Sequence, residues 1–339
     1  MIARLASGAF CEAIVSEIFT RSYKLKAFII RRLFQTLLTL FVVTLISFVI
    51  CMVLPGDPSL SVVGTEGASE EMIQTVRKEL GLDQPVVVQY FKWLSALVRG
   101  DFGMSIRTRV HVLTLFSQRL PVTLELLGLG ILFALLVALP MGILSSLRPN
   151  TWIDTAGTVL AVSGVAMPQF FLGMLLILVF GLWLGWLPSS GYFAPSEGLL
   201  RNIQGMILPA VSLGSVVAAE IMRQLRSSML EVLNEEYVQT ARAKGLAESM
   251  VVIKHALRNA LIPVVTLLGM RIGRLIGGIV IIEVVFSVPG IGRLLMNAVL
   301  FNDFPVLQTG VLLVAFAVTF INLLADISYS FLDPRIHHN

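Results

Sequence analysis

Residues 235–263, EEYVQTARAKGLAESMVVIKHALRNALIP, form a charged island between two strongly apolar stretches of the chain. The composition of residues 235–244 favours a helix, Gly245 permits a sharp turn, and a helical pattern resumes over residues 248–257. The second helix carries an apolar stripe of Val251, Val252, Ile253 and Leu257. Because loops that only join two elements are usually short, we interpret the island as a helix-turn-helix on which a partner docks.

The chain around this island is too apolar for a soluble protein. Its 339 residues are 56% hydrophobic and 14% charged, with a mean hydropathy of +0.86. One helical crossing of a bilayer requires about 20 apolar residues. Six segments meet or approach this length, at residues 33–54, 121–147, 155–187, 207–226, 262–285 and 306–327. The sequence therefore predicts an all-α polytopic membrane protein with six transmembrane helices.

The placement of lysine and arginine predicts the orientation of these helices. In the short segments the basic residues concentrate on one side, so we expect both termini and the island in the cytoplasm. Charged residues interrupt the start of the chain, which argues against a cleaved signal peptide. The predicted parts are a cytoplasmic segment 1–32, the span 33–54, an extracytoplasmic segment 55–119, a transmembrane domain 120–329 with the cytoplasmic loop 227–261, and a cytoplasmic tail 330–339.

The extracytoplasmic segment opens with a rigid turn, Pro55-Gly56-Asp57-Pro58. Residues 70–80 and 86–98 have the pattern of short amphipathic helices, separated by Gly81 and Pro85. We expect these helices to cap the bundle at its outer surface, with a plain solvated loop as the alternative.

The uncharged stretch 155–187 is too long for one straight crossing, because at about 1.5 Å per residue it exceeds a hydrocarbon core of about 30 Å. Pro168 removes a backbone hydrogen bond and is the natural place for a break. A broken helix at membrane depth is best tolerated where it lines a cavity, so Pro168 is a candidate pathway residue. The alternative is one long tilted helix anchored at the interface by Trp183 and Trp186.

Ionisable residues inside a bilayer usually face the bundle interior or water. Arg271 and Arg274 share a helix face at mid-depth, where a carboxylate-bearing solute can pair with them. Structural pairing with Glu220, Glu125 or a partner subunit is the alternative. Glu283 lies close to the outer end of its span and is read either as a polar gate or as a simple interfacial residue.

Signals of other chemistry are weak. Cys11 and Cys51 give no disulfide framework, and the histidines show no metal-ligand spacing. The sequence lacks the G-x-x-x-x-G-K-[ST] loop that cradles nucleotide phosphates, and it shows no catalytic triad pattern. The net charge of +4 reflects basic residues that flank the spans. We therefore expect no enzyme activity, no cofactor, no metal site and no nucleic-acid partner.

The segment Ala241-Arg242-Ala243-Lys244-Gly245 resembles the cytoplasmic EAA loop of binding-protein-dependent ABC importer permeases. Aligned on Gly245, the chain departs from the general motif. Gln239 and Thr240 stand where the motif has Glu and the first Ala, and His255 and Arg258 replace Ile and Pro around a matching Leu257.

The sequence is more similar to one branch, the dipeptide/oligopeptide/nickel permeases of the B-type subunit. The similarity runs from about residue 27 to the end, so residues 1–26 precede the usual start of the family. It includes Pro55-Gly56-Asp57-Pro58, Leu80-Gly81-Leu82-Asp83-Gln84-Pro85, Gly100-Asp101-Phe102-Gly103, Arg258-Asn259-Ala260-Leu261-Ile262-Pro263, Pro289-Gly290-Ile291-Gly292-Arg293-Leu294 and Asp333-Pro334-Arg335-Ile336.

This resemblance implies a multi-pass permease of the MetI-like ABC type-1 fold in the bacterial inner membrane. It also implies a second homologous permease, two cytoplasmic ABC ATPase subunits that hydrolyse the ATP, and an extracytoplasmic solute-binding protein. The island would couple the permease to an ATPase through Glu236, Tyr237, Thr240, Ala241, Arg242, Ala243, Lys244, Gly245, Leu246, His255, Arg258 and Asn259.

The resemblance favours di- and oligopeptides as solutes, with nickel chelates, glutathione, opines and sugars as alternatives. Two other classes of protein are weighed against the importer. A secondary transporter predicts internal repeats and paired broken helices, and a membrane enzyme predicts clustered catalytic groups. Neither pattern is found in the sequence.

Overall fold

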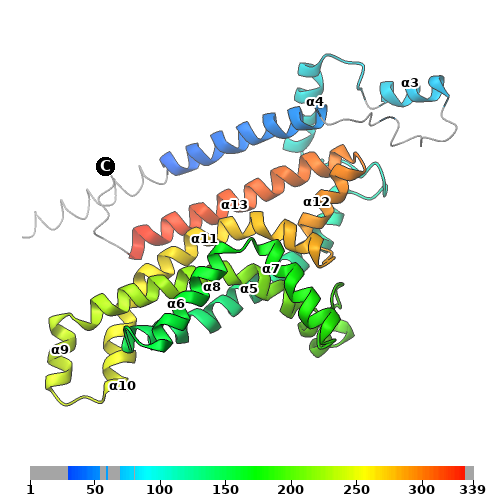
Figure 1. Cartoon of the computed structure of the whole chain (residues 1–339). Helices are drawn as coiled ribbons and strands as arrows, with labels where there is room; N and C mark the ends of the chain where they lie inside the picture. The colour runs from blue at the N-terminus through cyan, green and yellow to red at the C-terminus, as the bar shows by residue number, and fades with distance from the viewer. Residues whose placement is uncertain (1–29, 54–58, 60–68, 80, 333–339) are drawn as a thin grey trace, which may run out of the picture.

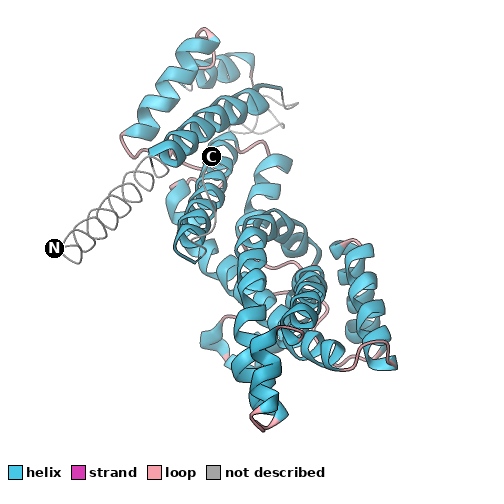
Figure 2. Cartoon of the chain, turned by 90° about the vertical axis from the view of Figure 1, so that its left-hand side faces the viewer, coloured by secondary structure: helices cyan, strands magenta, loops and turns pink. Residues whose placement is uncertain are grey.

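The computed structural model describes residues 30–53, 59, 69–79 and 81–332 (Figure 1). The described residues form helices joined by short connections (Figure 2). The N-terminal helix Ile30–Val53 is followed by α3 Glu70–Glu79, α4 Val86–Val98, α5 Val112–Leu147, α6 Trp152–Ala166, α7 Gln169–Leu176, the π-helical segment Ile177–Trp183, the 3-10 turn Pro195–Glu197, α8 Leu199–Leu233, α9 Glu236–Ala243, α10 Glu248–Met250, the π-helical segment Val251–Ala256, α11 Leu257–Val285, α12 Ile291–Leu300 and α13 Phe304–Leu332.

Five of these helices are long and apolar enough to cross a membrane: Ile30–Val53, α5, α8, α11 with the short segments before it, and α13. A sixth crossing results if the bent pair of α6 and the helix Gln169–Trp183 counts as one span. The all-α polytopic class predicted from the sequence is confirmed. The helices α9 and α10 project from one end of the bundle, called here the α9–α10 end, and α12 lies at the other, called the α12 end (Figure 1).

Helix α8 forms the centre of the bundle and packs most extensively against α5. Of its most apolar stretch, 72% is buried inside the protein. The two helices approach closely at Gly130 and Gly214, where a Cβ on Gly214 would overlap the carbonyl oxygen of Gly130. Further along, Gly142 makes room for the side chain of Leu225. Small residues allow this close approach, which matters in lipid because helix association there depends on van der Waals packing.

The long uncharged stretch is broken at the predicted proline. Helix α6 ends at Ala166, Pro168 precedes the first residue of α7, and the two axes differ by 107°. Helix α7 then packs across α8 and α11. The amide of Gln169 donates to the carbonyl of Leu213, and Gly173 lies against Phe286. The break therefore turns α7 over the middle of the bundle.

At the α12 end, the fully buried Glu283 holds the connection between α11 and α12. Its carboxylate accepts hydrogen bonds from the Thr123 hydroxyl at 2.7 Å and from the backbone N–H of Arg293 at 3.1 Å. The Thr123 oxygen in turn accepts the N–H of Ile291 at 2.9 Å. A carboxylate at the start of a helix satisfies unpaired N–H groups and complements the helix dipole. Helix α12 itself is absent from the sequence prediction.

The segment between α4 and α5 is fastened to the start of α13. The carboxylate of Asp303 accepts hydrogen bonds from the Ser105 hydroxyl at 2.5 Å and from the N–H of Ile106 at 3.0 Å. Helix α4 contacts the N-terminal helix, where the hydroxyl groups of Thr44 and Tyr90 lie 2.8 Å apart. The two short helices predicted at residues 70–80 and 86–98 are present as α3 and α4. The predicted turn at residues 55–58 lies outside the described residues, as does Leu80, the predicted last residue of the helix 70–80.

Several spanning helices extend beyond the apolar stretches that predict them. Helix α5 begins at Val112 rather than at residue 121 and contains Pro121, while α8 covers Leu199–Leu233 rather than residues 207–226. The added turns are stabilised by tertiary contacts: Val112 and Phe116 of α5 are buried in an apolar cluster with Phe304 and Leu307 of α13. Near the start of α8, for example, the amide of Asn202 donates to the carbonyl of Phe193 at 2.8 Å.

A Gly214→Ala substitution is expected to lower the stability of the purified protein, because the added methyl group has no space at the crossing of α5 and α8. Overpacking of this kind costs about 1–3 kcal/mol. Thermal unfolding followed by size-exclusion chromatography measures the loss. The control is Gly128→Ala on α5, where an added Cβ meets nothing within 4 Å. Equal stability of the two variants would contradict the close crossing.

Candidate functional site

The island folds as the predicted helix-turn-helix. Helix α9 ends at Ala243, and Gly245 adopts φ +77°, a left-handed conformation that favours glycine. The N–H of Gly245 donates to the carbonyl of Arg242 at 2.9 Å, which closes the helix end. The chain then continues through α10 and the π-helical segment Val251–Ala256 into α11. The island is thus joined to the bundle on both sides by helical structure.

A small apolar cluster holds α9 against the rest of the chain. Val238 and Val251 are fully buried, and Ala241 is nearly so. They pack against Val232 and Leu233 at the end of α8. Burying a valine side chain stabilises by about 1.5–3 kcal/mol, so this cluster fixes the orientation of α9 relative to α8.

Two polar contacts brace the island further. The guanidinium of Arg242 binds both carboxylate oxygens of Glu248 across the glycine turn, at 2.7 and 3.2 Å, and this hydrogen-bonded pairing raises the pKa of Arg242. On the other side, the amide of Asn259 donates to the Tyr237 hydroxyl at 2.7 Å, which itself lies 3.5 Å from the carbonyl of His255. These contacts link α9 to α10 and to the start of α11.

The outward face of the island, called here the α9–α10 surface, combines apolar and basic side chains. Its apolar members are the exposed Tyr237, Leu246, Met250 and Ile253, and its basic members are the exposed Lys244, Lys254 and Arg258. Glu236, Thr240, Arg242, Ala243 and Gly245 are exposed as well, His255 is half-buried, and Ala241 is buried. A mixed apolar and basic surface on a projecting, braced element is suited to docking a partner.

The predicted apolar stripe of the second helix is wrong in one position. Val251 and Val252 face inward, but Ile253 is 65% exposed. Consecutive residues of a helix point about 100° apart, so three in a row cannot share one buried face. Ile253 instead belongs to the α9–α10 surface.

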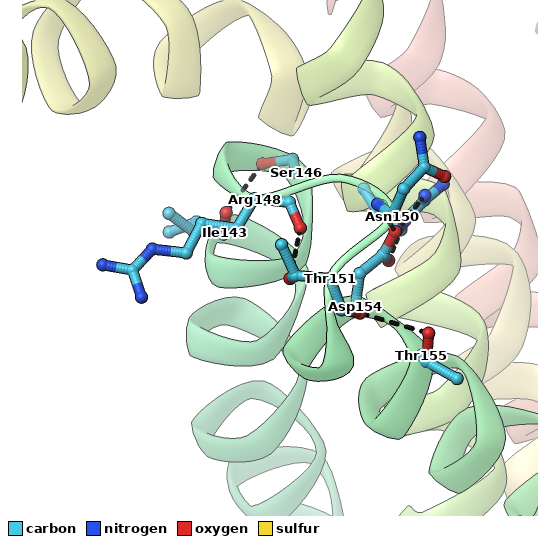
Figure 3. Close-up of polar contacts among 8 residues, drawn as sticks. Ile143, Ser146, Arg148, Asn150, Thr151, Asp154 and Thr155 are labelled. Atoms are coloured by element: carbon cyan, nitrogen blue, oxygen red, sulfur yellow. Dashed lines mark hydrogen bonds and ion pairs between the residues drawn. The ribbon is translucent and has the colours of Figure 1, made fainter.

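The end of α8 that leads into the island is tied to the turn between α5 and α6. Arg226 donates to both carboxylate oxygens of Asp154, at 2.6 and 2.7 Å, and the N–H of Asn150 donates to the same carboxylate at 2.9 Å. Figure 3 shows Asp154 directed toward Asn150 in this turn, beside Thr151. This pair was not predicted from the sequence, where its signal is an acid beside the start of one predicted span and a basic residue at the end of another.

The candidate pathway residues occupy different environments. Arg271 pairs with Glu220 at 2.7 Å, which joins α11 to α8. Arg274 is exposed on α11, and Pro168 is exposed at the break between α6 and α7. Glu283 is buried at the α12 end, where it accepts a hydrogen bond from the N–H of Arg293 on α12, and its place in the pathway stays a prediction.

Glu125 on α5, another acid in a spanning helix, is also paired within the chain. It accepts a hydrogen bond from the Tyr192 hydroxyl at 2.7 Å. Burial of the Tyr192 hydroxyl, together with this contact, raises the pKa of the tyrosine to about 12. The sequence left Glu220 and Glu125 as possible partners of Arg271. In the structure Arg271 forms its ion pair with Glu220, and Glu125 binds Tyr192 instead.

This geometry defines a helical membrane protein with a braced docking element at one end, and comparison with known proteins gives its family. Residues 138–338 match the family described as binding-protein-dependent transport system inner membrane component, and residues 25–127 match the corresponding N-terminal family. The glutathione transport system permease protein GsiC of Escherichia coli (strain K12) is 42% identical over 311 residues, which cover 92% of this chain and 99% of that protein. The protein of the same name from Shigella flexneri serotype 5b is 41% identical over the same length.

The chain therefore belongs to the family of binding-protein-dependent transport system inner membrane components. It is a multi-pass inner-membrane permease subunit of an ABC importer of the peptide/nickel group. It is not an enzyme, since ATPase activity in these importers lies in separate subunits.

An Asp154→Asn substitution is expected to lower stability by roughly 1–2 kcal/mol, because it removes the charge that Arg226 binds while Arg226 stays partly solvated. The apparent melting temperature of the purified chain measures this. Thr155→Ala, a change of an exposed neighbour on α6, is the control and is expected to leave it unchanged. If both variants have the same melting temperature as the wild type, the ion pair of Asp154 and Arg226 does not stabilise the contact between α8 and α6.

Proposed function

We propose that this permease couples ATP hydrolysis to import through the α9–α10 surface, and that it imports glutathione or small peptides. In this proposal it forms the translocation pathway with a second, homologous permease. Two ABC ATPase subunits bind at the α9–α10 end, and a solute-binding protein delivers the solute at the α12 end. The observation that carries the proposal is the projecting, internally braced island in a chain of this family.

The island is built to transmit movement. Its apolar cluster and its two polar contacts hold α9 and α10 as one unit, and the flanking helices α8 and α11 enter it without a flexible linker. An ATPase that moves the α9–α10 surface would therefore move α8 and α11 with it. These two helices carry the candidate pathway residues Arg271 and Arg274 and the partner Glu220.

The proposed orientation puts the α9–α10 end in the cytoplasm, where ATP is available. The basic residues of this end support it, among them Lys244, Lys254 and Arg258, because short cytoplasmic segments carry an excess of lysine and arginine. The α12 end then faces outward, together with α3 and α4.

The choice of solute rests on the relatives. Two of them are named glutathione transport permeases and are similar over nearly their whole length. From the sequence, glutathione is an alternative to the favoured di- and oligopeptides, and the relatives support this alternative. Nickel chelates, opines and sugars remain the alternatives for the same importer.

Replacing Gly245 with tryptophan is expected to abolish ATPase copurification and solute-driven ATP hydrolysis. None of the described residues lies within 4 Å of a Cβ at Gly245, so the new side chain is expected to obstruct a docked partner. A side chain at positive φ also costs about 1–2 kcal/mol of backbone strain, and the control variant is chosen to carry the same cost. The measurement is copurification of the ATPase from membranes that express the whole importer.

The matched control is Gly100→Trp. Gly100 also has a positive φ, of +82°, and nothing within 4 Å of a Cβ, but it lies between α4 and α5, away from the island. This variant is expected to retain the ATPase. If Gly245→Trp also retains it and transports normally, the island is not the coupling element.

The solute is tested with the whole importer in proteoliposomes that contain ATP on the side of the ATPase. Labelled glutathione is expected to accumulate, with competition from unlabelled dipeptides if the site accepts the wider class. Accumulation of a nickel chelate, with neither glutathione nor peptides transported, would overturn this choice of solute and leave the coupling proposal intact.

A further inference from the structure

Arg274 is an isolated charge on the exposed face of α11. Neighbouring positions on this face, Met270, Gly277 and Ile281, are exposed and carry no charge. Arg274 lies about 16 Å from the end of α11 at Val285, counting about 1.5 Å per residue. This distance is about half of a hydrocarbon core of about 30 Å. An arginine is therefore presented at mid-depth of the bilayer.

A polar strip on α8 continues from this depth toward the α9–α10 end. Glu220 and Gln224 are half-buried, and Arg223 and Ser227 are exposed. These positions share one face of a helix that is otherwise mostly buried. The ion pair between Glu220 and Arg271 joins the strip to α11, one turn from Arg274. We call these polar positions of the two helices, Glu220, Arg223, Gln224 and Ser227 on α8 with Arg271 and Arg274 on α11, the α8–α11 strip.

The charges of this strip are incompletely balanced. Glu220 compensates Arg271, but no side chain among the described residues pairs with Arg223 or Arg274. A guanidinium at mid-depth is costly against lipid, by about 2.5–3.5 kcal/mol on insertion scales. The strip must then face water, a solute or an acidic group of another subunit.

We propose that the α8–α11 strip is an anion-selective track in which Arg274 and then Arg223 bind the carboxylate groups of the solute as it moves toward the cytoplasm. This inference rests on the proposed function and names the chemistry of its solute: a small molecule with a net negative charge, as glutathione has at neutral pH. The length of the strip favours a moving solute over a partner subunit. A single structural pair requires one acid opposite Arg274, whereas a polar surface that continues through Arg223 to Ser227 suits passage.

The electrostatic test uses cysteine reporters in the assembled importer, with Cys11 and Cys51 replaced. Gly277→Cys places a thiol one turn from Arg274, at a position where an added Cβ meets nothing within 4 Å. Membrane-impermeant methanethiosulfonates, one anionic and one cationic, are compared by their rates of modification. Relative to a free thiol, the anionic reagent is expected to be favoured by about tenfold near a single partly desolvated charge. Adding Arg274→Gln is expected to remove most of this preference.

Leu136→Cys is the control for water access, because Leu136 is exposed on the spanning part of α5. It is expected to react slowly with both reagents. If Gly277→Cys reacts no faster than this control, the strip is not hydrated and the proposal fails. It also fails if Gly277→Cys shows no anionic preference, or if Arg274→Gln leaves that preference unchanged.

Transport gives an independent readout. Arg274→Gln is expected to reduce glutathione uptake at least fivefold while the complex still assembles and the ATPase still copurifies, and Arg274→Lys is expected to restore much of the uptake. If Arg274→Gln instead prevents assembly with the second permease, Arg274 pairs with that subunit and the track is overturned. Loss of the ATPase from the unsubstituted complex would contradict the proposed function itself, so the two failures are distinguishable.

Discussion

The bilayer core offers no hydrogen bonds to buried groups, and this constraint organises the described part of the molecule. Three acids within the spanning helices have partners from other segments. The pairs are Glu125 with Tyr192, Glu220 with Arg271, and Glu283 with Thr123. The helices approach one another through glycines, as at Gly130 and Gly214, because packing contacts hold helices together where the hydrophobic effect does not.

Two further contacts, one polar and one apolar, join the α9–α10 end to the bundle. Asp154 fastens the end of α8 to the turn between α5 and α6, and Val238 fastens α9 to the end of α8. Only residues 234 and 235 separate α8 from α9, and the π-helical segment Val251–Ala256 leads directly into α11. A displacement of the island is thus expected to reach mid-depth of the bundle through two long helices, rather than be absorbed in a loop.

The sequence was sufficient to predict features that depend on local patterns. These include the all-α class, the helix-turn-helix at Gly245 and the break at Pro168, since apolar length, glycine and proline act within a few residues. It was insufficient for α12 and for the contact between Asp154 and Arg226, which join residues far apart in the chain. Ile253 shows a third limit: a run of apolar residues predicts a helix but does not identify its exposed face.

The three arginines of the α8–α11 strip illustrate why pairing matters for transport. A cluster of uncompensated cations would bind an anionic solute strongly and hold it, whereas conduction requires sites that are weak enough to release it. Glu220 removes Arg271 from such a cluster and leaves Arg274 and Arg223 as separate sites along the strip. Although Glu220 itself repels an anion, its pairing with Arg271 would therefore favour anion transport, because it replaces one tight binding site with two weaker, successive ones.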